Sequence, residues 1–403
     1  MLGLILSSLL LLSLSLWTAY FIVIARDYHK TPHLSKNPSK KTLRNPPLIS
    51  IIIPSRNEEH RISRCIQTLK TQTYPNLEVL IVDDSTDHTV EVIKNIVGED
   101  KRFKIIKQKK LPDGWVGKPF ALQQGSENAK GDWLLFVDAD TWYDPVLIEK
   151  TMEYALENNL DMLSLAPRHI CKTFWEKVIQ PIPLGAIPAL SPLTKVNDPK
   201  SKVVLAGGPF ILIKRYVFNK IGGYQTIRSC IADDVELAKL VKTSGFRLGL
   251  VNAQSMMNLR MYERFREIWE GWSKVSFLGL VQKRGVESKT FQTLLFLLLL
   301  FTMFDLLVLP FFAILISISM TLVTGLTFWK YLLLFAFLTW LLSTLALAYA
   351  QRVYRIGEPL YAPLTLLLGG FVMLGVVADS TFKTLSGRGV TWKGRRYSVM
   401  KNR

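Results

Sequence analysis

At residues 133–140 the chain reads Trp133-Leu134-Leu135-Phe136-Val137-Asp138-Ala139-Asp140, an apolar run that ends in two carboxylates one residue apart. So short an apolar run is typical of a strand buried on both faces, which indicates a parallel sheet covered by helices. Aspartate is a poor strand former, so we expect the strand to end at Asp138. Ligands of open α/β sheets bind outside the carboxyl ends of the strands. Two carboxylates at that place suit Mg²⁺ or Mn²⁺ held together with substrate phosphates. An Asp-rich turn is the alternative interpretation.

Strands and helices alternate on both sides of this run. Upstream, we expect strands at residues 48–53, 77–82 and 103–107, and helices at about 57–72, 89–97 and 118–129. Short connections between such elements predict a parallel sheet with right-handed crossovers. Residues 160–258 are less regular, with short apolar strands at 162–167 and 208–213 and an acidic helix start at 232–234.

Long apolar segments flank this α/β block. Residues 2–25 are long enough to span a bilayer, and they lack the basic start and cleavage site of a signal peptide, so we expect an uncleaved anchor. Further apolar runs cover residues 291–328, 331–349 and 360–379. The first of these is too long for one span, so it forms either one tilted span or two short spans broken near Pro310. The sequence leaves open whether there are three or four C-terminal segments and on which side of the membrane the tail lies.

The charge pattern favours a membrane surface over nucleic acid. The chain has 403 residues, is 49% hydrophobic and carries a formal net charge of +18. Basic residues gather beside the apolar segments, namely Arg26, His29, Lys30, Lys36, Lys40, Lys41 and Arg44 after the first, and Lys393, Arg395, Arg396, Lys401 and Arg403 at the end. The positive-inside rule then predicts that the middle of the chain is cytoplasmic. No nucleic-acid motif is visible.

The three cysteines add a constraint on the compartment. Cys65, Cys171 and Cys230 lie far apart in the sequence and show neither metal-ligand spacing nor a disulfide framework. That arrangement fits a reducing compartment, in agreement with a cytoplasmic middle.

Three acidic pairs follow strands or begin a helix within the block: Asp83/Asp84, Asp138/Asp140 and Asp233/Asp234. Their order and the motifs around them resemble the family 2 glycosyltransferases with a GT-A fold over roughly residues 48–258. The matching stretches are Ile51–Glu58, Glu78–Asp87, Gly131–Asp140, Gly207–Arg215, Ile221–Tyr224 and Ala232–Ala238. The resemblance implies a Rossmann-like, mostly parallel sheet.

A narrower resemblance concerns the acceptor. The loop Leu111–Lys118 and the tail Ser386–Arg395 are similar to those of membrane glycosyltransferases that act on carotenoids, and of relatives linked to hopanoid synthesis. This similarity implies a lipid acceptor within the membrane.

The resemblance also assigns residues to the nucleotide. Pro54, Asn57 and Glu58 would line the nucleotide pocket, and Asp83 or Asp84 would accept a hydrogen bond from the uracil ring.

The metal and the diphosphate would lie beside the two aspartates that end the apolar run at residues 133–140. Asp138 would lie near the ribose and the metal, and Asp140 would ligate Mg²⁺ or Mn²⁺, which neutralises charge on the leaving nucleotide. Lys118 would reach the diphosphate as a point charge, and a solvated lysine at a helix start is the alternative.

Catalysis is assigned to the third acidic pair. A hydroxyl is a poor nucleophile, so Asp234 would act as the general base and Asp233 would tune or position it, with inversion at the anomeric carbon. Alternatively, both are helix-start charges that complement the helix dipole. Many relatives have Glu then Asp here, whereas this chain has two aspartates.

The chain lacks the Gln-x-x-Arg-Trp signature of processive polysaccharide synthases, and Arg264-Phe265-Arg266-Glu267-Ile268-Trp269 stands in a comparable place. We therefore expect transfer of a single sugar, with glucose as the expected one, from a UDP-sugar to a carotenoid or related terpenoid. The alternatives are a polyprenyl-phosphate glycosyltransferase, a processive synthase, and a non-catalytic membrane protein that binds nucleotide sugars. The oligomeric state stays open.

The expected organisation is a cytoplasmic GT-A domain flanked by transmembrane helices. We divide the chain into an anchor at 1–25, a basic linker at 26–47, the glycosyltransferase domain at 48–258, amphipathic interfacial helices at 259–289, a transmembrane region at 290–380 and a basic tail at 381–403.

Overall fold

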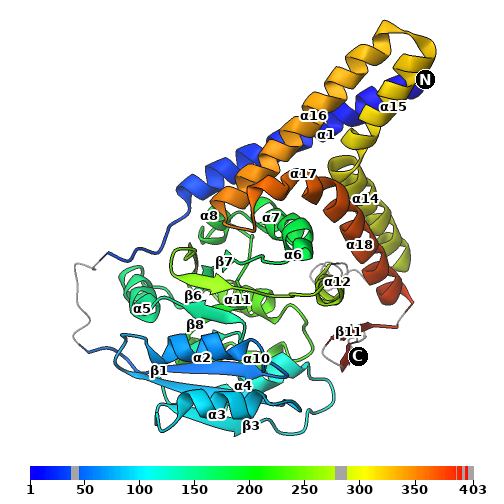
Figure 1. Cartoon of the computed structure of the whole chain (residues 1–403). Helices are drawn as coiled ribbons and strands as arrows, with labels where there is room; N and C mark the ends of the chain where they lie inside the picture. Colours follow the sequence, from blue (N-terminus) through cyan, green and yellow to red (C-terminus); the bar gives the residue numbers. More distant parts are fainter. Residues whose placement is uncertain (38–44, 277–287, 387, 393–394, 398–403) are drawn as a thin grey trace. The chain divides into compact units, whose positions relative to one another are not determined.

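The computed structural model describes residues 1–37, 45–276, 288–386, 388–392 and 395–397 (Figure 1). The chain forms two compact units. The α/β unit comprises Lys30–His169 and Leu193–Met261, and the helical unit comprises Met1–His29, Ile170–Pro192 and Tyr262–Arg403. Residues 170–192 thus group with the helical unit, whereas the sequence led us to run one domain without interruption from 48 to 258.

A central seven-stranded sheet organises the α/β unit. Its strands, in spatial order, are β3 (Phe103–Lys107), β2 (Leu77–Asp83), β1 (Ile49–Ser55), β4 (Trp133–Val137), β8 (Phe210–Lys214), β6 (Met162–Ala166) and β9 (Leu248–Asn252). Strand β8 runs antiparallel to β4 and β6, while β1 pairs in parallel with β2 and β4, β2 with β3, and β6 with β9. The prediction of a mostly parallel sheet is confirmed.

Helices cover both faces of this sheet. On one face pack α2 (Ile62–Lys70), α3 (Thr89–Val97) and α5 (Leu147–Glu157), and on the other α4 (Gly117–Asn128), α9 (Arg215–Lys220), α10 (Gly223–Thr226) and α11 (Asp233–Thr243). Successive strand residues supply opposite cores, because side chains alternate across a strand. Ile51 and Ile53 enter the first core and Ile52 the second. All residues of β4 are buried, as its apolar composition predicts.

The strand order places the ligand site. The chain moves outward from β1 to β2 and β3, then returns to the other side of β1 with β4. Such a reversal opens a crevice at the carboxyl ends of the two central strands, where ligands of α/β sheets bind. Ser55 ends β1, and Asp138 follows β4 directly.

A small three-stranded sheet continues from this crevice. Strands β5 (Thr141–Tyr143), β10 (Met257–Leu259) and β7 (Arg168–His169) lie in the order β5-β10-β7. Leu259 pairs with Thr141 on one side and His169 on the other, so the three residues lie in a row across the sheet. The short helix α8 (Leu193–Val196) also belongs to the α/β unit.

Within the described residues, four helices are long and apolar enough to cross a membrane: Leu2–Lys30, Thr290–Leu307, Thr327–Val353 and Pro359–Leu385. The first is α1 (Leu2–Lys30), and the last combines a 3₁₀ turn (Pro359–Tyr361), α17 (Ala362–Leu364), a π-helical turn (Thr365–Gly369) and α18 (Gly370–Leu385).

The long apolar run from 291 to 328 is broken. Helix α14 (Lys289–Leu307) ends at Val308, and α15 (Leu309–Thr324) begins with Pro310 in its first turn. Proline has no N–H and suits a helix start, which explains the position of the break. Helix α15 is shorter than a usual span, and it lies side by side with α16 (Thr327–Val353) (Figure 1).

The described residues of the helical unit also form α6 (Phe174–Ile179), α7 (Pro181–Leu190), α12 (Phe265–Val275), β11 (Val390–Trp392) and β12 (Arg395–Tyr397). Helix α12 covers part of the expected amphipathic segment. Its Trp269 Nε1 and Ser273 Oγ both donate to the Asp379 carboxylate of α18, at 2.9 Å each. Residues 277–287 of that segment lie outside the described residues, as do Lys40, Lys41 and Arg44 of the linker and Lys393, Lys401 and Arg403 of the tail.

Candidate active site

The loops after β1 and β2 are joined by hydrogen bonds. Asn57 has a positive φ of 54°, a conformation that asparagine tolerates better than most residues. Its N–H donates to Ser85 Oγ at 2.9 Å, and its Oδ1 accepts from the Thr86 N–H at 2.9 Å. The N–H of Glu58 donates to Thr89 Oγ1 at 2.8 Å. Pro54, in β1, pairs with β2. The residues predicted to line the nucleotide pocket therefore meet at one edge of the sheet.

The first acidic pair divides into two different environments. Asp83 is buried, and its carboxylate accepts from the N–H and the hydroxyl of Ser85 at 3.0 and 2.7 Å. Asp84 forms an ion pair with Arg56 from the loop after β1. Asp83 therefore shapes its own loop, while Asp84 ties that loop to its neighbour.

The second acidic pair follows β4, as predicted. Asp138 and Asp140 are both half-buried. The carbonyl of Asp138 accepts from Thr141 Oγ1 at 2.7 Å, and the carbonyl of Asp140 accepts from the Arg260 N–H at 3.2 Å. These bonds fix the turn from β4 into β5, so the two carboxylates hold their place at the carboxyl edge.

Lys118, near the start of α4, lies beside this pair. Its Nζ is 2.6 Å from Asp138 Oδ1, and the two side chains are 33% and 25% exposed. Burial lowers the pKa of Lys118, but the carboxylates of Asp138, Asp233 and Asp234 outweigh burial and raise it, so the side chain stays charged. The interpretation of Lys118 as a solvated lysine is wrong, because it is the counter-ion of an acidic site.

The third acidic pair begins α11. Asp234 Oδ2 accepts from the Gly208 N–H at 2.9 Å, and Oδ1 accepts from the Val235 N–H at 2.8 Å. Burial raises the pKa of Asp234, although Lys118 and these hydrogen bonds oppose it. Asp233 is buried. Both residues lie in the first turn of α11, where negative charge also complements the helix dipole.

Gly208 makes the contact with Asp234 possible. A Cβ at this position would lie 2.9 Å from Asp234 Oδ2 and 3.3 Å from its Cγ. Any side chain would therefore displace the carboxylate or break its hydrogen bond. Within the motif Gly207-Gly208, Gly208 thus holds the Asp234 carboxylate through its N–H.

The donor atoms fit a divalent cation. Mg²⁺ usually takes one or two carboxylates and completes its shell with phosphate oxygens and water. Asp138 and Asp140 supply such a pair, and the ion pair of Asp138 with Lys118 shows that this carboxylate already holds a cation. Among the described residues, no group of three or more His, Cys, Asp or Glu is placed to hold a metal by itself.

Residues 50–222 match the family model "Glycosyl transferase family 2". The chain carries a family 2 glycosyltransferase domain. The matched segment includes Asp83, Asp84, Asp138 and Asp140 and ends before Asp233.

The curated relatives of this glycosyltransferase domain are enzymes of carotenoid chemistry by name. A 4,4'-diaponeurosporenoate glycosyltransferase of Staphylococcus aureus (strain USA300) is 28% identical over 239 residues, which are 58% of this chain and 62% of the relative. The Staphylococcus haemolyticus protein of the same name is 25% identical over 234 residues, 57% of this chain and 61% of the relative. The chain thus spans less than two thirds of the length of the curated relatives it matches.

A solved structure supports the GT-A fold. The mannosyltransferase PcManGT from Pyrobaculum calidifontis, in complex with GDP-Man and Mn²⁺, matches with a TM-score of 0.54 and 18% identity. The match covers 96% of this chain and 99% of that one. At this identity it shows a shared fold.

Tyr224 belongs to the surroundings of the glycosyltransferase site, although the motifs gave it no role. It is fully buried, with its ring 5.1 Å from Phe136 and 5.7 Å from Phe218. Burial and the nearby Asp233, Asp234 and Asp138 raise its pKa well above the ordinary value. Its hydroxyl has no hydrogen-bond partner within the described part of the chain. The aromatic position was visible in Gly222-Gly223-Tyr224, but its proximity to the acidic residues was not.

His169 is a second residue that the sequence did not single out. It lies in β7, in the same row of the small sheet as Thr141, which follows Asp140. Burial lowers its pKa to about 4, so the imidazole is neutral at physiological pH. From the sequence alone, a single histidine between irregular segments gives no indication that it lies in this row.

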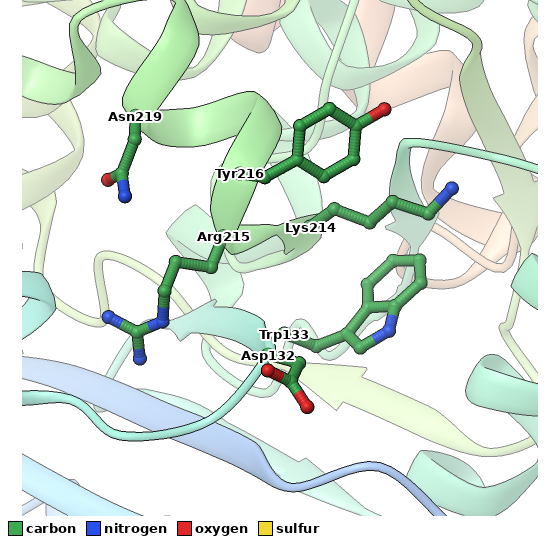
Figure 2. Close-up of a pocket in the computed structure, with 6 residues that line it drawn as sticks. All are labelled: Asp132, Trp133, Lys214, Arg215, Tyr216 and Asn219. Atoms are coloured by element: carbon green, nitrogen blue, oxygen red, sulfur yellow. The ribbon is translucent and has the colours of Figure 1, made fainter.

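The glycosyltransferase domain also has a hollow at the opposite edge of its sheet. Figure 2 shows this pocket of about 330 Å³, lined by Asp132, Trp133, Lys214, Arg215, Tyr216 and Asn219. Trp133 begins β4 and Lys214 ends the antiparallel β8, so the pocket lies at the amino end of β4. Lys214 Nζ is 2.9 Å from Asp161 Oδ1, and Arg215 Nε donates to the Gly131 carbonyl at 2.6 Å.

Proposed function

We propose that this protein is a metal-dependent, inverting glycosyltransferase that moves a single sugar from a UDP-sugar to a lipid acceptor in the membrane. The sugar is glucose, and the acceptor is a hydroxylated carotenoid or related terpenoid. The observation that carries the proposal is the meeting of Asp138, Lys118 and Asp234 at the carboxyl edge of a family 2 glycosyltransferase domain. The names of the curated relatives support a carotenoid acceptor.

The donor occupies the crevice between β1 and β4. Pro54, Asn57 and Glu58 line the nucleotide side, and Asp83 or Asp84 accepts a hydrogen bond from the uracil. Asp138 and Asp140 hold Mg²⁺ or Mn²⁺ together with the diphosphate of the donor, which fits the donor atoms found there. The cation supplies charge neutralisation for the leaving UDP. Lys118 contributes a further positive charge to the same oxygens.

Asp234 acts on the acceptor. Its carboxylate takes the proton of the acceptor hydroxyl while the hydroxyl oxygen forms a bond to the anomeric carbon and the bond from that carbon to UDP breaks. Attack from the side opposite to UDP inverts the anomeric centre. The hydrogen bond from Gly208 and the adjacent Asp233 hold Asp234 in place for this step. The raised pKa of Asp234 makes it a stronger base than an ordinary aspartate.

The acceptor comes from the bilayer. In the part of the chain that the structure describes, four helices are long and apolar enough to cross a membrane. We place the protein in the cell membrane as a multi-pass enzyme with its α/β unit in the cytoplasm, where UDP-sugars are available. The basic residues after α1 support this orientation.

A direct test uses membranes that contain the full-length protein. They are incubated with a panel of radiolabelled nucleotide sugars, UDP-glucose first, and the lipids are extracted. Label in a terpenoid lipid is expected with wild type and not with Asp140→Asn. The matched control is Asp132→Asn, which removes a carboxylate at the opposite edge and leaves labelling intact. No label in any lipid fraction across the panel would overturn the proposal.

An acceptor that is already anionic is a second candidate. The relatives' name contains a carboxylate, diaponeurosporenoate, and a polyprenyl phosphate is anionic as well. Neither has a hydroxyl proton to remove, so the reaction needs no general base. Turnover by Asp234→Asn separates the two cases, because a hydroxyl acceptor requires Asp234 and an anionic acceptor does not.

A further inference from the structure

The ion pair between Lys118 and Asp138 uses a carboxylate that the proposed function gives to a divalent cation. Lys118 Nζ lies 2.6 Å from Asp138 Oδ1. A metal ion that ligates this oxygen competes with the ammonium group, because two positive charges so close together repel each other. Binding of the metal at this oxygen therefore favours movement of the Lys118 side chain.

The position of Lys118 is set by the acidic residues and not by its helix. Lys118 lies in the first turn of α4, where the helix dipole disfavours positive charge. The carboxylates of Asp138, Asp233 and Asp234 all stabilise its charged form. Lys118 is thus an ammonium group that all three carboxylates attract.

The backbone that carries Lys118 is fixed, so only the side chain needs to move. The Val116 N–H donates to the Arg228 carbonyl at 2.7 Å, and the ring of Trp115 packs against Phe120 at 5.4 Å. A lysine side chain has a flexible four-carbon stem and three donors, so it can exchange one anionic partner for another nearby.

We propose that Lys118 is a built-in counter-ion that occupies Asp138 until the donor binds, and then moves to the donor diphosphate as the divalent cation takes its place. This inference rests on the proposed function and adds the order in which its site fills. In the exchange Lys118 trades a carboxylate for phosphate oxygens, and Asp138 trades an ammonium group for the metal. Metal and nucleotide therefore bind cooperatively, and each strengthens the other by the same factor.

The test measures binding and not turnover. Mn²⁺ is titrated into the purified full-length protein in detergent, with and without UDP, and free Mn²⁺ is followed by electron paramagnetic resonance. For wild type, we expect UDP to tighten Mn²⁺ binding about tenfold or more, within the usual range of coupling between sites. For Lys118→Met, we expect Mn²⁺ alone to bind about tenfold more tightly than to wild type, and the effect of UDP to shrink to less than about threefold.

Lys214→Met is the matched control. Lys214 also pairs with an aspartate, Asp161, at 2.9 Å and with similar exposure, but at the opposite edge of the sheet. The Lys214→Met protein should bind Mn²⁺ and UDP as wild type does. Lys118→Arg keeps the positive charge and should retain weak binding of Mn²⁺ alone. Lys118→Gln replaces the methionine variant if that variant does not fold.

Each outcome decides a different claim. The exchange is supported if UDP no longer strengthens Mn²⁺ binding in the uncharged Lys118 variants but still does so in wild type and in the other variants. Wild-type coupling in a folded Lys118→Met or Lys118→Gln protein overturns the role of Lys118 and leaves the proposed function intact. Absence of Mn²⁺ and UDP binding in wild type overturns both.

Discussion

The two edges of the central sheet both carry acidic and basic side chains, but these charged groups are paired differently at each edge. At the carboxyl edge, the carboxylates of Asp138, Asp233 and Asp234 all lie near Lys118. At the amino edge, Lys214 pairs with Asp161, and Arg215 donates to the carbonyl of Gly131. The comparison teaches that three carboxylates gathered near one lysine, in place of one, distinguish the edge at which we propose that the donor binds.

The pocket described above lies at the amino edge of the sheet and not at the carboxyl edge. The hollow of Figure 2 lies among Asp132, Trp133 and Lys214, far along β4 from Asp138. There, Lys214 lies over the ring of Trp133 at 5.6 Å and joins the starts of β4 and β6 through Asp161. These contacts stabilise the sheet, and they assign the amino edge a structural role.

The largest effect is expected from the general base. Asp234→Asn keeps the size of the side chain and one acceptor oxygen for the N–H of Gly208 or Val235, but it removes the proton acceptor, so turnover should fall by about 10²–10⁴-fold with a hydroxyl acceptor. UDP binding should stay within a few-fold of wild type. Single-turnover transfer measures the first and calorimetry the second. Near-normal turnover would identify an anionic acceptor instead.

A second effect concerns stability at the carboxyl edge. The folded protein holds the pKa of His169 at about 4, below the unfolded value of about 6.5, because burial disfavours the charged ring. The unfolded state therefore binds more protons, and stability falls as the pH drops from about 6.5 to 4. The loss is at most about 3 kcal/mol, and less because the ring is partly exposed.

Melting temperatures of the full-length protein between pH 7.5 and 4 measure this effect. His169→Gln has no such titration, so its melting temperature should fall less over the same range. Parallel curves for wild type and variant would show that His169 is not held neutral by the fold.

A third, smaller effect tests how Asp234 is held. Gly208→Ala places a Cβ where the Asp234 carboxylate lies, so the carboxylate must shift. We expect turnover to fall by about 10- to 100-fold, since small misplacements of reacting groups are costly. The control is Gly245→Ala, whose φ of 80° strains the backbone but whose Cβ meets no atom within 4 Å. Equal turnover of both variants would mean that Gly208 does not position the base.

Much of the carboxyl edge could be predicted from sequence, because its signals are local. Short apolar strands end in aspartates, and β2, β3, β4, α3 and α11 lie where their composition and end residues place them. The carboxyl ends of neighbouring parallel strands meet at one edge, which predicted the place of Asp138 and Asp140, whereas Asp233 and Asp234 reach it from the start of α11.

The features that were missed depend on partners distant in sequence. The pairing of Lys118 with Asp138 arises because α4 and β4 are neighbours in space, and a lysine at a helix start looks the same whether it is solvated or paired. The antiparallel β8 and the row from Thr141 to His169 are set by register between segments about 70 to 120 residues apart. The grouping of residues 170–192 with the helical unit likewise rests on contacts with elements near both ends of the chain.

The smallest effect is expected at the amino edge, and it tests the comparison most directly. Tyr216 is 57% exposed and lines the hollow, and its ring is 6.0 Å from Phe246 at the surface. Tyr216→Ala and Asn219→Ala should change turnover by less than about twofold, as surface substitutions away from a site usually do. A loss of more than tenfold in either variant, with an unchanged melting temperature, would show that this edge binds a ligand of its own. The pairing of charges would then not distinguish the ligand-binding edge from the other edge, and the pocket would belong to the functional surface of the protein.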